Sequence, residues 1–209
     1  MSDLETRKGQ KSPSPHSVTG VILAGGKSLR YGRNKALVEI KGVRLIDRVV
    51  GVMSGIFHKL LIVTNTPEEY AYLHIPMVED LIKGLGPLGG LYTGLKTISD
   101  EAGFFVACDM PFINSSLIRH MIETGKEFDA VVPRVDWKIE PLHALYHKTC
   151  LPLIEKAIEE ERYQIIRFFD EIRVRYVREE EIRRFDPHLR TLININKPEE
   201  LTRAARLAR

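Results

Sequence analysis

The chain has 209 residues, of which 44% are hydrophobic and 28% are charged, and its formal net charge is +3. This length supports one substantial core, and so mild a charge does not by itself favour nucleic-acid binding. No apolar run approaches the length of a membrane span. The cysteines, Cys108 and Cys150, fit neither a disulfide framework nor a structural zinc site. We therefore expect a cytoplasmic protein that binds neither nucleic acid nor a membrane.

The N-terminal residues differ in composition from the rest of the chain. They are rich in Ser, Pro and charged side chains and lack the apolar centre of a signal peptide. No internal repeat or interior linker divides the remainder. We predict a disordered leader over residues 1–17 and a single domain over residues 18–209.

From residue 18 onward, short apolar runs alternate with amphipathic stretches. The predicted strands are, in chain order, 18–23, 60–63, 75–78, 103–107, 129–133, 142–146, 174–177 and 192–195. The predicted helices are 45–57, a short one through residue 70, 87–98, one capped by Asn114 or Ser115, 151–158, 165–169 and one that begins at Pro198. This alternation favours the α/β class, with a mostly parallel mixed sheet and helices on both faces.

Residues 21–35, VILAGGKSLRYGRNK, form the most informative stretch of the chain. Its apolar start suits a buried strand that runs directly into Gly25 and Gly26. Glycines at the carboxyl end of a strand let the backbone approach a ligand closely. The cations that follow, Lys27, Arg30 and Lys35, suggest a polyanion such as a nucleoside triphosphate.

Polar residues recur at the ends of the predicted strands. Gly25, Asn65, Asp80 and Asp109 each fall at or just beyond the carboxyl end of a strand. Because those ends share one edge of a parallel sheet, we expect the four residues to converge there.

Two common nucleotide motifs do not fit the glycine segment. A dinucleotide fingerprint starting at Gly25 requires glycine at position 27, which is Lys27. A P-loop ending at Gly26-Lys27-Ser28 requires its first glycine at position 21, which is Val21.

The remaining pattern, L-A-G-G-x-S-x-R-x-G-x-x-K from Leu23 to Lys35, resembles the signature loop of nucleotidyltransferases with a glycosyltransferase-A-like fold. That fold is Rossmann-like and of the nucleotide-diphospho-sugar transferase type. Four more motifs occur in the order found in the molybdenum cofactor guanylyltransferases, which the chain resembles. They are GPLGG at 86–90, CDMP at 108–111, PLHALY at 141–146 and NINKPEEL at 194–201.

The resemblance implies an activity and its substrates. The family transfers GMP from GTP to the terminal phosphate of molybdenum-molybdopterin, giving molybdopterin guanine dinucleotide cofactor and pyrophosphate, with Mg²⁺ as the metal. A phosphate monoester, whose second pKa is about 6, needs no strong base to act as nucleophile. The required groups are therefore a metal, cations and backbone amides. Product transfer to molybdoenzymes implies transient contact with them.

The matching positions imply specific roles. Lys35 and Arg30 contact the triphosphate, and Asp109 is the metal ligand, since a carboxylate suits a hard cation. These three are the predicted catalytic residues. The predicted GTP-binding residues are Leu23, Ala24, Gly25, Gly26, Lys35, Asn65, Asp80 and Asp109. The candidates for the pterin side are Asn194, Asn196, Arg134 and His143.

Alternatives stay open for some residues and for the reaction. Asn196 is a second metal ligand, a contact to the second substrate or an Asx-turn before Pro198, and His143 is a core histidine or a pterin contact. The rival reactions are cytidylyl transfer to the same pterin and, more distantly, sugar-phosphate nucleotidyl transfer. A non-catalytic nucleotide-binding protein on the same fold is the alternative outside enzymes. Cytidylyltransferases of this kind usually read L-A-A-G at the loop, whereas Gly25-Gly26 here favours guanine.

Overall fold

The computed structural model of the chain describes residues 17–25, 34–196 and 198–208. The predictions for the leader over 1–16 and for Gly26, Lys27 and Arg30 lie outside these ranges.

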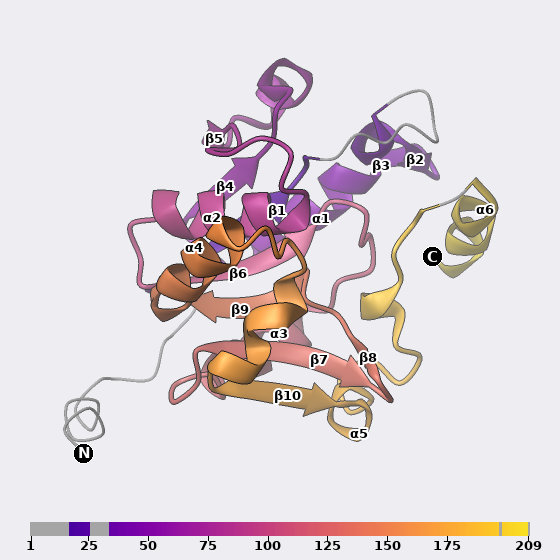
Figure 1. Cartoon of the computed structure of the whole chain (residues 1–209). Coiled ribbons are helices and arrows are strands. Elements are labelled where there is room, and N and C mark those ends of the chain that lie inside the picture. The colour runs from indigo at the N-terminus through magenta and orange to yellow at the C-terminus, as the bar shows by residue number, and fades with distance from the viewer. Residues whose placement is uncertain (1–16, 26–33, 197, 209) are drawn as a thin grey trace.

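The described part of the chain is built on one mixed sheet with the strand order β10-β7-β9-β6-β1-β4-β5, in which β8 pairs with β7 (Figure 1). Neighbours on this path run parallel, except that β9 is antiparallel to both β6 and β7. The predicted mostly parallel sheet is thus confirmed. The strands are β1 (Val18–Leu23), β4 (Leu60–Val63), β5 (Met77–Val78), β6 (Ala102–Ala107), β7 (Ala130–Val135), β8 (Lys138–Ile139), β9 (His143–His147) and β10 (Val174–Arg178).

The central strands explain the continuous apolar runs of the sequence. Every residue of β1 and of β6 is buried, because a parallel strand covered by helices on both faces has no solvated side. The registers Leu23↔Val63 and Leu23↔Ala107 align the carboxyl ends of β1, β4 and β6. The chain leaves all three strands at the same edge of the sheet.

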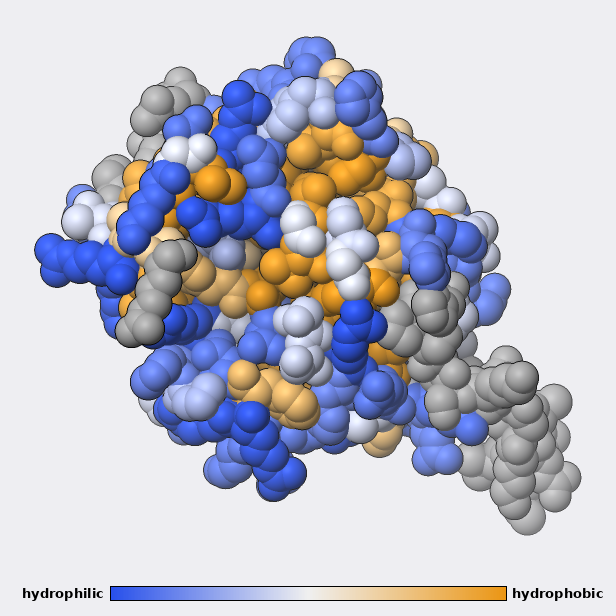
Figure 2. Space-filling model, turned by 180° about the vertical axis from the view of Figure 1, so that it is seen from behind, coloured by the Kyte–Doolittle hydropathy of each residue, from blue (hydrophilic) through white to orange (hydrophobic). Residues whose placement is uncertain are grey.

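Two helical layers cover the sheet. On the face turned to the viewer in Figure 1 lie α2 (Pro87–Thr97) and α4 (Leu151–Glu159), which share an apolar core with η5 (Ile165–Glu171). The other face is packed by α1 (Leu45–Ser54) and α3 (Ser115–Glu123). Figure 2 shows the molecule from behind, with apolar residues across its centre and hydrophilic residues around them. The remaining helical segments are η2 (Lys35–Leu37), η3 (Pro67–Leu73), η4 (Lys148–Cys150), α5 (Glu179–Ile182), η6 (Arg190–Leu192) and α6 (Pro198–Leu207).

Most predicted elements are present with shifted ends. The helix predicted over 45–57 ends at Ser54, and the segment predicted over 165–169 is a 3-10 helix rather than an α-helix. The Asn114 side chain caps α3 by accepting from the Leu117 amide at 2.9 Å, as predicted. No helix in the described ranges is long and apolar enough to cross a membrane.

The strand predicted over 192–195 is wrong. Leu192 ends the short helix η6, and residues 193–196 follow without joining the sheet. The Ile195 amide donates to the Asp109 carbonyl at 3.0 Å, which fastens this segment beside the end of β6 rather than in a ladder. Its apolar residues are accounted for by packing and not by strand pairing, because Ile195 is fully buried in a separate small core.

A hairpin of β2 (Glu39–Ile40) and β3 (Val43–Arg44) was not predicted. Its turn residues, Lys41 and Gly42, have φ values of 52° and 76°, which suits the mirror-image turn of tight hairpins. The hairpin matters for the site because Ile40 packs with Ile195 and with Ala204 of α6. That packing brings the C-terminal segment next to η2.

Candidate functional site

The site lies where the central strands end. Beyond the strands, the Ala24 amide donates to the Val63 carbonyl at 2.9 Å, and the Cys108 amide donates to the Leu23 carbonyl at 3.1 Å. These bonds hold the exits of β1, β4 and β6 together around a cavity of about 540 Å³, a volume suited to a small-molecule ligand. Its lining is Leu23, Ala24, Gly25, Asn34, Lys35, Ala36, Val63, Asp80, Gly86, Pro87, Gly90, Ala107, Cys108, Asp109, Leu142 and Asn196.

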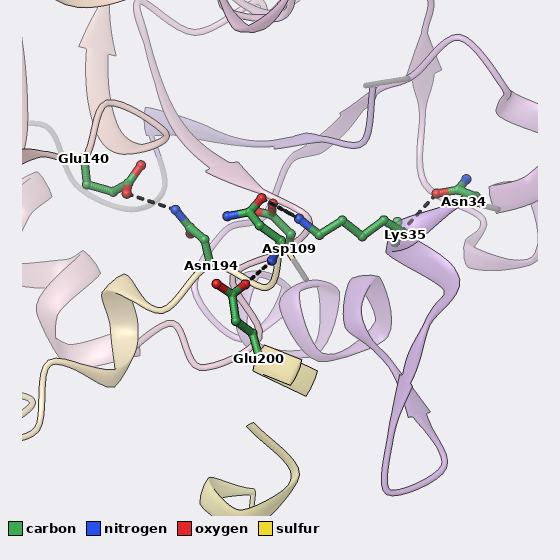
Figure 3. Close-up of polar contacts among 8 residues, drawn as sticks. Asn34, Lys35, Asp109, Glu140, Asn194 and Glu200 are labelled. Carbon is green, nitrogen blue, oxygen red and sulfur yellow. Dashed lines mark hydrogen bonds and ion pairs between the residues drawn. The ribbon is translucent and has the colours of Figure 1, made fainter. Parts of the chain in front are cut away.

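Three predicted site residues from distant parts of the chain meet at this cavity (Figure 3). The Lys35 ammonium lies 2.6 Å from Asp109 Oδ2 and donates to Asn196 Oδ1 at 2.8 Å. The Lys35 and Asp109 side chains are only 14% and 20% exposed, so this ion pair is screened less than one on the surface. A cation, a carboxylate and an amide oxygen are therefore gathered at one point of the pocket wall.

A hydrogen-bonded brace holds the backbone before Lys35. Asn34 Oδ1 accepts from the Ala36 amide at 3.0 Å and caps η2, while Asn34 Nδ2 donates to the Tyr70 hydroxyl at 2.6 Å. The Tyr70 hydroxyl in turn donates to the Ala24 carbonyl at 3.4 Å. Burial raises the pKa of Tyr70 above its ordinary value, so the hydroxyl keeps its proton and remains a donor. The brace links the end of β1 to the residue that precedes Lys35.

Asn65 and Asp80 form a second polar group at the cavity. Asn65 Nδ2 donates to Asp80 Oδ2 at 2.7 Å, and the Asp80 amide donates back to Asn65 Oδ1 at 3.2 Å. Asp80 lines the cavity, whereas Asn65 is not one of its lining residues. A Cβ placed on Gly25 would stand 3.8 Å from Asp80 Oδ2 and 3.9 Å from Asn65 Nδ2. The missing side chain of Gly25 thus leaves open the space in front of this polar pair.

The residues at the start of α2 present backbone rather than polar side chains to the cavity. Gly86 precedes the helix with a φ of 59°, a left-handed conformation that favours glycine. Gly86, Pro87 and Gly90 all line the cavity. The N-terminus of α2 therefore faces the pocket, and a helix N-terminus favours anionic groups.

The structure brings some of the pterin-side candidates to the cavity and others not. Asn196 lines the cavity, and Asn194 lies beside it with Nδ2 donating to Glu140 Oε2 at 3.1 Å (Figure 3). Arg134 is on β7, where its guanidinium stacks over the Tyr176 ring at 5.0 Å. His143 is fully buried, and its ring lies edge-on to Phe104 at 5.3 Å. The structure does not bring Arg134 or His143 to the cavity.

His143 is thus in the core position that the sequence left open for it. Neither ring nitrogen has a hydrogen-bond partner among the described residues. Burial lowers the pKa of His143 from its ordinary 6.5 to about 3, so the ring is neutral at physiological pH.

Cys108 lines the cavity next to Asp109 but does not behave as a nucleophile. Burial raises the pKa of its thiol to about 12, and the neighbouring Asp109 charge acts in the same direction. The thiolate is the reactive form of cysteine, so the site carries no activated thiol at Cys108.

The donor atoms present fit a hard divalent cation only in part. Within the described ranges, no group of three or more His, Cys, Asp and Glu side chains could hold a metal ion. Asp109 and Asn196 nevertheless present a carboxylate and an amide oxygen to the same ammonium. Magnesium is commonly held by one or two carboxylates together with substrate phosphates, and this pair of residues fits that arrangement.

Sequence reasoning missed the supporting residues Asn34, Tyr70 and Glu140. Asn34 carried a local signal, because an Asn before a short helix is a common cap. Tyr70 and Glu140 carried none, since their contacts depend on residues far away in the chain.

Comparisons with known proteins identify the family of the chain. The family model described as "MobA-like NTP transferase domain" matches residues 20–176. A probable molybdenum cofactor guanylyltransferase of Pelotomaculum thermopropionicum is 38% identical over 190 residues, which cover 91% of this chain and 93% of the relative. A molybdenum cofactor guanylyltransferase of Desulfosudis oleivorans is 37% identical over 190 residues, covering 90% and 94%.

Among solved structures, the molybdopterin-guanine dinucleotide biosynthesis protein A of Archaeoglobus fulgidus superposes with a TM-score of 0.81. It is 28% identical to this chain, and the superposition covers 91% of this chain and 98% of the Archaeoglobus chain. The match extends over nearly the whole of both chains. The chain belongs to the MobA-like NTP transferases and to the family of the molybdenum cofactor guanylyltransferases.

Proposed function

We propose that the chain transfers GMP from GTP to the terminal phosphate of molybdenum-molybdopterin, releasing pyrophosphate. The observation that carries this proposal is the convergence of Lys35, Asp109 and Asn196 on a cavity that is also lined by Asp80, which Asn65 holds by a hydrogen bond. The names of the relatives, which describe guanylyl transfer, support the same reaction.

Two polar groups line the cavity, Asp80 and the cluster of Lys35, Asp109 and Asn196. They suit the two ends of a nucleotide. Asp80 presents a carboxylate that accepts hydrogen bonds from a guanine edge or a ribose hydroxyl, and Gly25 leaves room in front of it. Lys35 supplies a point charge for the triphosphate. The N-terminus of α2 adds backbone amides beside Pro87. We infer that the base lies toward Asp80 and the phosphates toward Lys35.

In the reaction, an oxygen of the acceptor phosphate bonds to the α-phosphorus of GTP as the bond to the bridging oxygen of pyrophosphate breaks. The acceptor is already ionised at neutral pH, because its second pKa is about 6. The chain therefore has to hold two anions together and offset the charge on the departing pyrophosphate. Lys35 serves this purpose once it turns from Asp109 toward the triphosphate.

Magnesium is the metal that we propose for this site. Asp109 would hold it, with the Asn196 amide oxygen as a further donor, and the bound ion would supply positive charge to the phosphate oxygens. Arg30, which lies outside the described residues, stays a predicted triphosphate contact on the basis of its motif position.

The test is a binding and transfer assay with the purified chain. GTP and CTP are titrated by calorimetry with and without Mg²⁺, and each nucleotide is then incubated with molybdenum-molybdopterin. We expect Mg²⁺-dependent binding of GTP and formation of the guanine dinucleotide with equimolar pyrophosphate. Preferential use of CTP would identify a cytidylyltransferase, and binding without transfer would identify a non-catalytic nucleotide-binding protein.

A further inference from the structure

Glu140 is a buried acid at the edge of the site that the reaction above does not use. It follows β8 directly and is only 8% exposed. Its amide donates to the Pro133 carbonyl at 3.1 Å, which ties the residue to β7. The side chain points toward Asn194 in Figure 3, and its Oε2 accepts from Asn194 Nδ2 at 3.1 Å.

The buried position of the Glu140 side chain is unfavourable for its charged form. Burial raises the pKa of Glu140 above its ordinary value, although the Asn194 amide and the positive charge of Lys138 act in the opposite direction. A carboxylate removed from water destabilises the fold unless hydrogen bonds or a nearby cation offset the cost. The Asn194 amide and the Leu142 backbone N–H provide such bonds, and these bonds stabilise the acid at this buried position.

The contact fixes the orientation of the Asn194 amide. Asn194 Nδ2 donates to Glu140 Oε2, so Oδ1 faces away from that carboxyl group. That oxygen is buried without a hydrogen-bond partner among the described residues. Among the residues that the structure describes, Glu140 is therefore the hydrogen-bond partner that holds the polar end of this side chain.

Asn194 belongs to the segment that delivers Asn196 to the pocket. Within this segment the Ile195 amide donates to the Asp109 carbonyl at 3.0 Å, and Asn196 Oδ1 accepts from Lys35 at 2.8 Å. The segment is not a strand and has no ladder to hold it. Burial of Ile195 and the bond from the Asn196 amide to Glu200 Oε2 also hold it, and the Glu140 contact is the one that reaches across from the β7–β8 hairpin.

We propose that Glu140 is a positioning residue for the second-substrate side of the pocket: by fixing Asn194 it holds the 194–196 segment, and with it Asn196, against Lys35 and Asp109. This inference rests on the proposed function in assigning the segment to the pterin side. It predicts that loss of the Glu140 acceptor weakens use of the pterin more than binding of the nucleotide, because Asp80 and Gly25, to which we assign the base, do not belong to the 194–196 segment.

The test compares Glu140→Leu with Glu140→Gln. Leucine removes the acceptor at nearly constant volume, whereas the glutamine amide keeps one oxygen that can accept from Asn194. We expect Glu140→Leu to raise the KM for the pterin on the order of tenfold, with the Kd of GTP within about twofold of wild type. Glu140→Gln should restore the pterin KM to within about threefold of wild type.

A second readout does not involve the pterin. Hydrogen exchange of the Ile195 amide, followed by NMR, reports directly on its bond to Asp109. We expect Glu140→Leu to accelerate this exchange on the order of tenfold and Glu140→Gln to leave it near wild type. Asn194→Ala should act like Glu140→Leu, and the double variant should add little to either change. Glu159→Leu, at an exposed position of α4, is the matched control and should change neither readout.

The outcomes separate the two proposals. If wild type fails to transfer GMP to the pterin but Ile195 exchange responds as expected, the proposed function fails while the positioning role stands. A loss of thermal stability in Glu140→Leu with unchanged Ile195 exchange overturns the positioning role. Equal losses for GTP and pterin overturn it as well. Should Glu140→Leu not fold, Asn194→Ala and Glu140→Gln decide the matter by the same readouts.

Discussion

The Lys35 ammonium lies 2.6 Å from Asp109 Oδ2, although the two residues are 74 positions apart in the sequence. One comes from η2, after the glycine loop, and the other from the end of β6. The pair places the proposed phosphate contact against the proposed metal ligand, and the same ammonium also reaches Asn196. The groups that we assign to the phosphates and the metal thus meet at the Lys35 ammonium.

Asp109→Asn should abolish guanylyl transfer and largely spare the fold. The substitution keeps the shape of the side chain and removes the charge that we assign to metal binding, so we expect a loss on the order of 10²-fold or more in kcat/KM. The assay is pyrophosphate release with saturating GTP and pterin. Asp100→Asn is a matched control, because Asp100 forms an equally short 2.6 Å ion pair with Lys59 near the start of β1. Full activity of the Asp109 variant would refute the metal assignment.

Gly25→Ala should impair the use of GTP without unfolding the protein. The added methyl would lie 3.8 Å from Asp80 Oδ2, an ordinary contact, but it would fill the space in front of the Asn65–Asp80 pair. We expect the KM for GTP to rise on the order of tenfold, and the ratio of CTP to GTP use to rise, since the loop then reads L-A-A-G. Gly51→Ala on α1, where no atom lies within 4 Å of an added Cβ, is the control and should leave both nucleotides unaffected. An unchanged KM for GTP would place the base elsewhere.

Tyr70→Phe should weaken both the fold and nucleotide binding. It removes only the hydroxyl that accepts from Asn34 and donates to the Ala24 carbonyl. We expect a loss of about 1–2 kcal/mol in the free energy of unfolding, together with a several-fold weaker Kd for GTP. Urea unfolding and calorimetry measure the two effects. Tyr72→Phe makes the same change at a half-exposed tyrosine of η3, which donates to Asp47, and should cost less. Equal costs for the two variants would argue against the brace.

His143→Leu should reduce the acid sensitivity of the fold. The pKa of His143 is about 3 in the folded protein and 6.5 ordinarily, so between these values the unfolded chain binds more protons than the folded one. His143 therefore lowers stability as the pH falls below 6.5. Between pH 7 and pH 5 we expect wild type to lose about 2 kcal/mol more than the variant. Denaturant unfolding at both pH values gives the difference, and His188→Leu, at an exposed histidine, should retain the pH dependence of wild type. Parallel losses in wild type and His143→Leu would contradict the assigned burial.

The local patterns of the sequence predicted the main strands and helices of the scaffold, but not the β2–β3 hairpin. The apolar runs before Gly25 and Asp109 predicted β1 and β6, because strands buried on both faces have no polar alternation. The apolar run at 192–195 misled the same reasoning. Its residues are apolar because Ile195 is buried under α6, and hydrophobicity does not distinguish strand pairing from such packing.

The residues of the candidate site were likewise predictable only in part. Lys35, Asp80 and Asp109 were predictable, since each stands where a strand or a glycine loop ends, and parallel strands bring their carboxyl ends to one edge. Arg134 and His143 looked like site residues from their neighbours in sequence but face Tyr176 and the core instead. Successive side chains of a strand point to opposite faces of the sheet, and a single sequence does not state which face lies against the core and which residues reach the cavity.

By itself, the sequence determined the strand–helix order, the glycine loop and the residue types that handle phosphate, because these follow from local periodicity and spacing. Only the tertiary structure decided that Asn196 meets Lys35 across 161 positions and that Glu140 holds Asn194 across 54. Those contacts arise when the β2–β3 hairpin and α6 bury a shared core around Ile195. Their energy comes from packing between distant segments, which no local pattern records.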